Sequence, residues 1–137
     1  MSSVVPFPSK ARLQARGQET ADKDLAASGS RSLDEVATLM RLPAGEISRM
    51  AKSGVLLALT SQGELRFPSF QFDDSVRIVL GLAEIRRTLN FESPWSVLHY
   101  FITPDNALSG RRPIDVLREG NMMAVLTSAN TVGVQGA

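Results

Sequence analysis

Helix-breaking residues divide the apolar pattern of this chain into short segments, and this division constrains the fold more than any other feature. Apolar residues recur at helical spacing from Ser32, but Pro43 interrupts the pattern, Gly54 ends the next segment, and Pro94 and Pro113 each begin a new one. No apolar run approaches the roughly 20 residues that a membrane helix requires. Because 43% of the 137 residues are hydrophobic, the chain can bury a core. We therefore expect a small, mainly α-helical protein.

Charge and cysteine content narrow the chemistry. The formal net charge is +1, so DNA binding would require cations placed locally on one surface. The chain contains no cysteine, which excludes disulfides, zinc-thiolate sites and thiol nucleophiles. The first residues lack the basic and apolar regions of a signal peptide. We expect a cytoplasmic protein with no membrane association, no metal and no other cofactor.

The first 31 residues are predicted to be a flexible tail and linker. They contain few large apolar residues, their charges are mixed, and residues 26–30 have the Ala/Ser/Gly composition of a linker. A second interpretation is open, because Lys10, Arg12 and Arg16 would suit a basic arm that touches DNA or a partner subunit.

Residues 32–67 have the pattern of two helices followed by a hairpin. Ser32 and Glu35 form a capping-box sequence, Pro43 is placed to begin a second helix, and Gly54 is placed to end it. Two short apolar segments then flank a turn that contains Gly63. This order is typical of winged or excisionase-like helix-turn-helix modules, so we interpret residues 32–67 as a DNA-binding domain.

The second helix of this module is the candidate recognition helix. A recognition helix needs one apolar face, here Ile47 and Met50, and an outer face of small and cationic groups that can enter the major groove. Glu46 opposes this interpretation, because an acid near the helix start repels phosphate, and the alternative is a helix pair that touches no DNA. The candidate DNA-binding residues are Ala44, Gly45, Ser48, Arg49 and Lys52, with Arg66 on the hairpin.

Residues 68–137 are predicted to be helical. Apolar spacing indicates a helix from Ser75 to Leu89, with Asp73 and Asp74 at its N-terminal cap. A further helix follows Pro94, a short one runs from Pro113 to Gly120, and the last runs from about residue 121 to 130. Residues 131–137 are expected to form a small-residue tail.

Signals for catalysis are weak. His99 is the only histidine, so no histidine pair can hold a metal or share acid–base work, and we expect it to be a partly buried structural residue. Asp73 and Asp74 are adjacent and would point about 100° apart on a helix. The glycines are isolated and form no phosphate-binding loop. The sequence therefore predicts a protein that is not an enzyme.

A series of motifs in the second half of the chain carries a family resemblance. Residues 66–73 read Arg-Phe-Pro-Ser-Phe-Gln-Phe-Asp, Pro94-Trp95 precedes a helix, Leu108 to Pro113 form a Leu-x-Gly-x-x-Pro turn, and Leu117 to Gly120 form a Leu-x-x-Gly helix end. In order and spacing this series resembles the toxin-binding domain of the Xre/MbcA/ParS-type antitoxins. The resemblance covers roughly half of the chain, from about residue 67 to residue 129.

This resemblance implies a function and partners. In the family the domain binds a toxin of the RES type, which attacks NAD or transfers ADP-ribose, and blocks its active site, while the dimeric antitoxin represses its own operon. It implies a type II antitoxin whose partners are a cognate toxin, operator DNA and a second copy of the chain. By this analogy the toxin-binding candidates are Arg111, Arg112, Arg118, Asn121 and Asn130, together with residues 130–137. Surface charge exposed only to solvent is the alternative for the arginines.

The amino-terminal module departs from the family pattern. Many members carry a longer Xre-type helix-turn-helix, whereas this chain has a short pair of helices followed by a hairpin. A second function therefore stays open, that of a stand-alone DNA-binding transcriptional regulator without a toxin partner.

Overall fold

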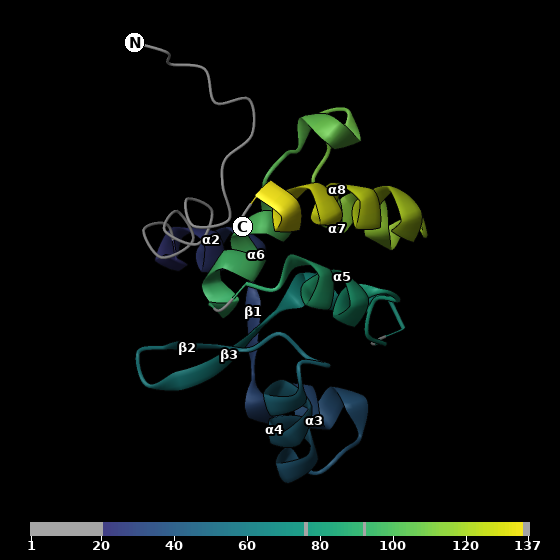
Figure 1. Cartoon of the computed structure of the whole chain (residues 1–137). Helices are drawn as coiled ribbons and strands as arrows, with labels where there is room; N and C mark the ends of the chain where they lie inside the picture. Colours follow the sequence, from purple (N-terminus) through teal and green to yellow (C-terminus); the bar gives the residue numbers. More distant parts are fainter. Residues whose placement is uncertain (1–20, 76, 92, 136–137) are drawn as a thin grey trace.

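The computed structural model describes residues 21–75, 77–91 and 93–135 and confirms the predicted fold class (Figure 1). These residues form a mainly helical chain with one small antiparallel sheet, and no helix among them is long and apolar enough to cross a membrane. The elements in chain order are α2 (Ala21–Ser28), β1 (Ser30–Ser32), α3 (Leu33–Met40), α4 (Ala44–Ser53), β2 (Leu59–Ser61), β3 (Glu64–Pro68), the 3-10 helix η1 (Ser69–Gln71), α5 (Leu82–Leu89), α6 (Pro94–Ile102), the 3-10 helix η2 (Asn106–Leu108), α7 (Pro113–Arg118) and α8 (Met122–Gln135).

The helix pair forms as its sequence predicts. The Ser32 hydroxyl accepts a hydrogen bond from the Glu35 N–H at 3.1 Å, and the Ser32 N–H donates to the Glu35 carboxylate at 2.8 Å, so the capping box is complete. Helix α4 starts directly after Pro43 and ends at Gly54, whose φ of 87° is in the left-handed region that favours glycine. A small core beneath α3 and α4 consists of Val36, Ile47, Leu56, Phe67 and Phe72.

The predicted hairpin is confirmed, and a third strand extends it. Strands β2 and β3 pair antiparallel with Ser61 opposite Glu64, and Gln62 and Gly63 form the turn with positive φ values of 52° and 81°. Strand β1 pairs with the other edge of β3, which gives the order β1-β3-β2. The hairpin projects from the helix pair as a wing (Figure 1).

The prediction of a flexible tail and linker was wrong for residues 21–31. Helix α2 packs against α6, Leu25 is buried in the main core, and β1 is part of the sheet. The physical reason is that α2 is a short helix whose stability comes from tertiary packing on a distant partner rather than from its own propensity. Residues 1–20 of the predicted tail, including Lys10, Arg12 and Arg16, lie outside the described residues.

Two helix boundaries in the second half also differ from prediction. Helix α5 begins at Leu82 rather than Ser75, and Asp73 accepts hydrogen bonds from the Ser75 and Arg77 N–H groups within a loop. Ile78 fits helical spacing but packs on the core from extended backbone bridged to Phe72. Helix α8 continues through Gly133 to Gln135 rather than stopping near residue 130, because no proline intervenes and the core buries Val132.

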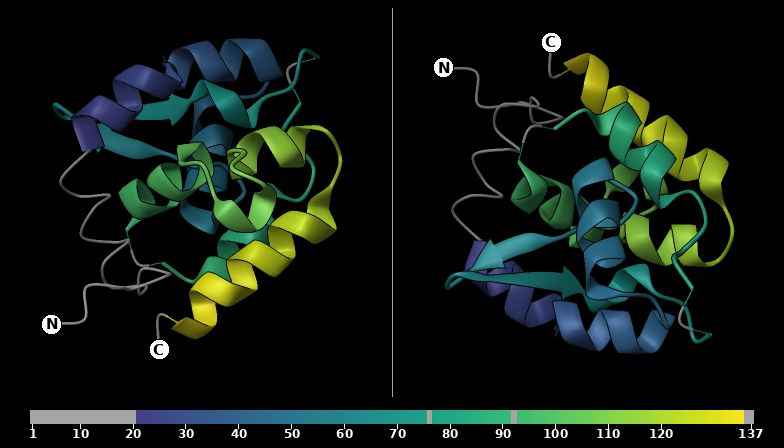
Figure 2. Two further views of the ribbon diagram at one scale, coloured as in Figure 1. Left: turned by 90° about the horizontal axis from the view of Figure 1, so that it is seen from above. Right: turned by 90° about the horizontal axis from the view of Figure 1, so that it is seen from below.

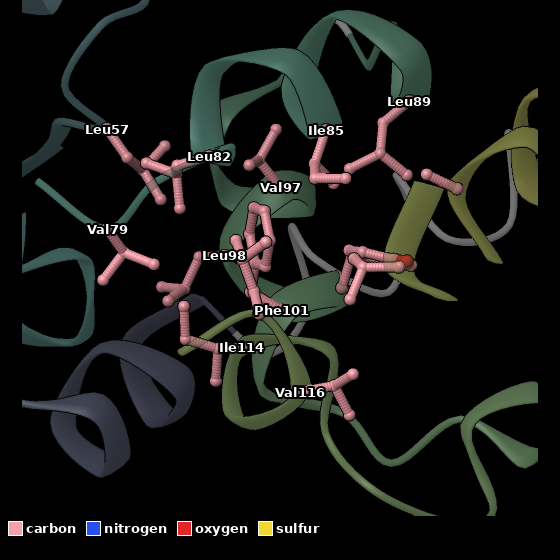
Figure 3. Packing of buried hydrophobic residues seen from close by; sticks show 14 of the residues in the cluster. Leu57, Val79, Leu82, Ile85, Leu89, Val97, Leu98, Phe101, Ile114 and Val116 are labelled. Carbon is pink, nitrogen blue, oxygen red and sulfur yellow. The ribbon is translucent and has the colours of Figure 1, made fainter. Parts of the chain in front are cut away.

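The main core lies among α5, α6, α7 and α8. Helix α6 is central, and its Val97, Leu98 and Phe101 point toward Leu82 and Ile85 of α5 on one side and toward α7 on the other (Figure 3). Helix α8 packs against α5 and α7, on the opposite side of the molecule from α3 in both views of Figure 2. The helical half, residues 69–135, thus forms a platform from which the helix pair and the wing project.

Candidate nucleic-acid interface

The structure brings most of the predicted DNA-binding residues together on one face of α4. Ile47 is fully buried on the inner side of the helix, so Gly45 and Arg49, each two positions away along the chain, lie on the opposite, outward side. The Arg49 side chain is 78% exposed and Lys52 is exposed one turn further on, while Ser48 is half-buried at the edge of the face. The outer face of α4 consists of Ala44, Gly45, Ser48, Arg49 and Lys52.

Gly45 has no structural requirement within the chain. A Cβ atom built on it meets nothing within 4 Å, and its φ lies outside the left-handed region. Within a helix, glycine is less favourable than alanine by up to about 1 kcal/mol. The absent side chain leaves the first turn of α4 flat, which would let another molecule approach the helix backbone closely.

The charges on α4 are exposed and weakly engaged. The Arg49 guanidinium lies 3.4 Å from the Glu46 carboxylate, but both side chains are open to solvent, so the pair is weak and can be exchanged for another anion. Pro43 provides no side-chain cap for the helix start, which carries the positive end of the helix dipole. Arg49 and Lys52 are therefore available for an anionic partner, and Glu46 partly offsets them.

Arg66 takes a different role from the predicted phosphate contact. Its Nε donates to the Ser30 hydroxyl at 3.0 Å, and its Nη2 donates to the Ser30 carbonyl oxygen at 3.2 Å. The half-buried guanidinium therefore braces β1 against β3. The prediction placed Arg66 on the hairpin, and the pairing of β1 with β3 brings Ser30 within reach of its side chain.

Two exposed residues, one in the turn before α4 and one at the wing tip, were missed by the sequence analysis. Arg41 ends α3 in the turn before α4 and holds a φ of 57°, a conformation in which glycine or asparagine is usual. Gln62 lies at the tip of the wing with a φ of 52°. For Arg41, the available signal was a basic residue at the end of a helix, where glycine is usual. For the wing tip, the signal was the Gln-Gly pair between two predicted strands.

The arginines predicted to bind a toxin already have partners within the chain. Arg111 makes a two-pronged ion pair with Glu119, and Arg112 makes one with Asp115 at 2.8 and 2.9 Å. Arg118 donates Nη1 to the carbonyl oxygens of Phe70 and Phe72, at 2.8 and 2.7 Å, which ties α7 to the end of the sheet. These residues do not gather into a surface of free cations.

The two predicted asparagines lie at different places on α8. The Asn121 side-chain oxygen accepts from the Ala124 N–H at 3.3 Å and so caps the helix start, while Asn130 is exposed on the third turn. Two large apolar side chains of this half are also exposed: Leu80 is 87% exposed and Met123 is 70% exposed. Their segments touch, because Gly81 lies against the Met122 side chain.

His99 is partly buried and contacts another side chain of the fold, as the sequence analysis predicted. Its Nδ1 lies 2.8 Å from an Asp24 carboxylate oxygen, and both side chains are largely buried where α2 packs on α6. No group of three or more potential metal ligands occurs within the described ranges. These contacts assign His99 a part in holding α2 in place.

A strand, two helices joined by a tight turn, and a hairpin wing define a winged helix-turn-helix arrangement, here followed by a helical half. No family model and no curated protein matches the chain. Among solved structures, the chain is similar to the NMR structure of Rv2175c, with a TM-score of 0.68 and 22% sequence identity, covering 77% of this chain and 82% of that one. At this identity the likeness shows a common fold.

Proposed function

We propose that this chain is a sequence-specific DNA-binding protein that inserts α4 into the major groove. The observation that carries the proposal is the outer face of α4, where small residues and two exposed cations stand opposite the buried Ile47. A B-DNA major groove is about 12 Å wide and admits one helix if its outer face is not bulky. Gly45 and Ser48 have small side chains that do not obstruct this face, and the longer Arg49 side chain can extend beyond them.

Each exposed residue then has a distinct task. Arg49 is placed to hydrogen-bond a guanine edge, and Ser48 to contact a base or a phosphate. Lys52 and Arg41 lie toward the two ends of the helix, where the phosphate backbones pass. The wing tip at Gln62 would contact the neighbouring backbone or minor groove. Glu46 would repel a phosphate at its own position, which helps to fix the position of α4 along the groove.

We further propose that the protein binds as a homodimer and acts as a transcriptional regulator in the cytoplasm, where bacterial operators lie. A single helix-turn-helix makes few base contacts, and pairing two copies on two half-sites multiplies the affinity.

The proposed DNA binding is tested with the DNA upstream of the protein's own gene. We expect retardation of this DNA at low salt, and we expect Arg49→Ala to weaken binding by about 1–3 kcal/mol if Arg49 reads a base. Arg112→Ala is the matched control, because it removes one exposed arginine from the N-terminal cap of α7, and α7 lies at the opposite end of the molecule from α4 (Figure 1). Equal binding by all three proteins would contradict the assignment of α4 as the recognition helix.

A second function is favoured by the exposed apolar residues of the helical half. We propose that Leu80 and Met123 contact a protein partner, which the antitoxin resemblance identifies as an NAD-directed toxin of the RES type. Because α8 and α4 lie at opposite ends of the molecule, partner and DNA could be bound together (Figure 1). Without such a partner the chain would be a stand-alone regulator.

Co-expression tests the second function. The wild-type chain should rescue growth from the product of a neighbouring toxin gene, and Leu80→Asp with Met123→Asp should abolish rescue. Ala27→Asp, which adds a charge at an exposed position on α2 instead of on α8, should leave rescue intact. Failure of the wild-type chain to rescue growth would leave DNA regulation as the function.

A further inference from the structure

The segment that leaves α4 is held by side chains from the helical half. This exit segment, residues 54–57, connects α4 to β2. Gln71 of η1 accepts from the Leu57 N–H at 2.8 Å and donates to the Leu57 carbonyl oxygen at 2.8 Å, like a neighbouring strand. Arg86 of α5 donates Nη1 to the carbonyl oxygens of Gly54 at 3.1 Å and Leu56 at 3.2 Å. The end of α4 is therefore fastened to both η1 and α5.

Arg86 is placed for these carbonyl groups rather than for an acid. Across the described ranges no carboxylate lies within ion-pair distance of its guanidinium. Burial lowers the pKa of Arg86, which reflects the cost of desolvating an unpaired cation. The compensation comes from the C-terminal carbonyl end of α4, where the helix dipole is negative. Packing alone would not require a charged side chain at this half-buried position.

Resting on the proposed DNA binding, we propose that Arg86 is a positioning residue for DNA recognition, which sets the angle at which α4 projects from the helical half. Helix α4 has 10 residues and is therefore about 15 Å long. Given the rise of about 1.5 Å per residue, a tilt of about 10° at its fastened end would move the backbone of Arg49 by roughly 1 Å and that of Gly45 by roughly 2 Å. Such a shift exceeds the tolerance of a hydrogen bond to a base edge.

The position of Arg86 also couples the two halves of the molecule. Its backbone belongs to α5, which packs against α8, while its guanidinium holds the end of the recognition helix. A displacement of α5 by any partner of the helical half would move the end of α4. Arg86 thus connects α5, which packs against α8, with the end of the recognition helix.

The test compares two neighbouring arginines of α5. Arg86→Met removes the carbonyl contacts and keeps the length of the side chain, Arg86→Lys keeps a charge that can donate to one carbonyl, and Arg87→Met removes an exposed charge from the same helix. For each folded variant we would measure affinity for upstream DNA, the dependence of affinity on salt, and amide exchange of residues 50–57. Urea unfolding establishes that each variant is folded under the binding conditions.

The expected result is a loss of affinity of about tenfold in Arg86→Met, similar to loss of one well-placed base contact, with faster exchange at residues 50–57. Arg86→Lys should recover part of the loss, and Arg87→Met should bind like the wild type. The salt dependence should not change, because a positioning residue neutralises no phosphate.

Three outcomes would overturn the proposal. One is a folded Arg86→Met that binds DNA and exchanges like the wild type. Another is a smaller salt dependence, which would make Arg86 a direct phosphate contact. If Arg86→Met fails to fold, full wild-type affinity in Arg86→Lys with faster exchange would assign Arg86 to stability alone. If wild-type protein binds no DNA, the proposed function fails, while the exchange data still report whether Arg86 holds the exit segment.

Discussion

Asp24 on α2, in the first half of the chain, contacts His99 on α6, in the second half. The distance between the carboxylate oxygen and Nδ1 is 2.8 Å. The contact is largely shielded from solvent, since the two side chains are only 13% and 14% exposed. It fastens α2 to the central helix of the main core. From there the chain passes through Gly29 directly into β1, so α2 also determines where the edge of the sheet begins.

Asp24→Ala should therefore destabilise the protein. The substitution removes the carboxylate that contacts His99, and loss of a shielded hydrogen bond to a charged group costs about 1–3 kcal/mol. The free energy of unfolding in urea measures the effect. Asp22→Ala on the exposed side of α2 is the control and should change stability little. An equal effect of the two substitutions would mean that the contact with His99 contributes nothing specific.

Two glycines should respond in opposite ways to alanine. Gly81 has a φ of 92°, and an added Cβ would lie 2.6 Å from the Met122 sulfur, so Gly81→Ala should destabilise the fold by about 2 kcal/mol or more. Gly45 has open space and ordinary backbone, so Gly45→Ala should leave stability unchanged or raise it slightly. Thermal unfolding compares them. In a DNA-binding assay Gly45→Ala should bind more weakly, and unimpaired binding would remove Gly45 from the interface.

Stability should decline at acid pH partly through two ion pairs on and beside α7. Arg112 lowers the pKa of Asp115, and Arg111 lowers the pKa of Glu119, relative to their ordinary values of 3.8 and 4.5. A carboxyl group whose pKa is lower in the folded state stabilises the fold above its unfolded pKa, and this contribution is lost as the pH falls through the folded value. The melting temperature should therefore fall below about pH 4.5. The Arg111→Ala/Arg112→Ala variant should show a shallower decline, and an unchanged decline would assign the acid sensitivity to other groups.

The elements that sequence predicted correctly depend on local chemistry. The capping box of Ser32 and Glu35, the stop at Gly54 and the start at Pro113 each involve residues within one helical turn, so neighbouring letters suffice to identify them. The outer face of α4 follows from helical periodicity once Ile47 is known to be inside. Most of the candidate DNA surface was predictable for this reason.

The parts that prediction missed depend on contacts between distant residues. Helix α2 is stable because α6 receives it, and Arg66 bonds Ser30 because an unforeseen strand pairs beside it. Arg118 looked like a free surface cation, yet it donates to carbonyl groups near residue 70. Arg86 was assigned no role at all, since nothing near it in sequence shows that the end of α4 lies against α5.

The central claim, that α4 and the wing form a DNA-binding surface, is tested most directly by titrating isotope-labelled protein with upstream DNA and mapping the amide shifts by NMR. If this surface binds DNA, the largest shifts at low salt will fall on residues 41–52 and on the wing tip at 61–64, with little change on α7 and α8. Shifts concentrated on α7 and α8, or no shifts at any DNA concentration, would contradict it.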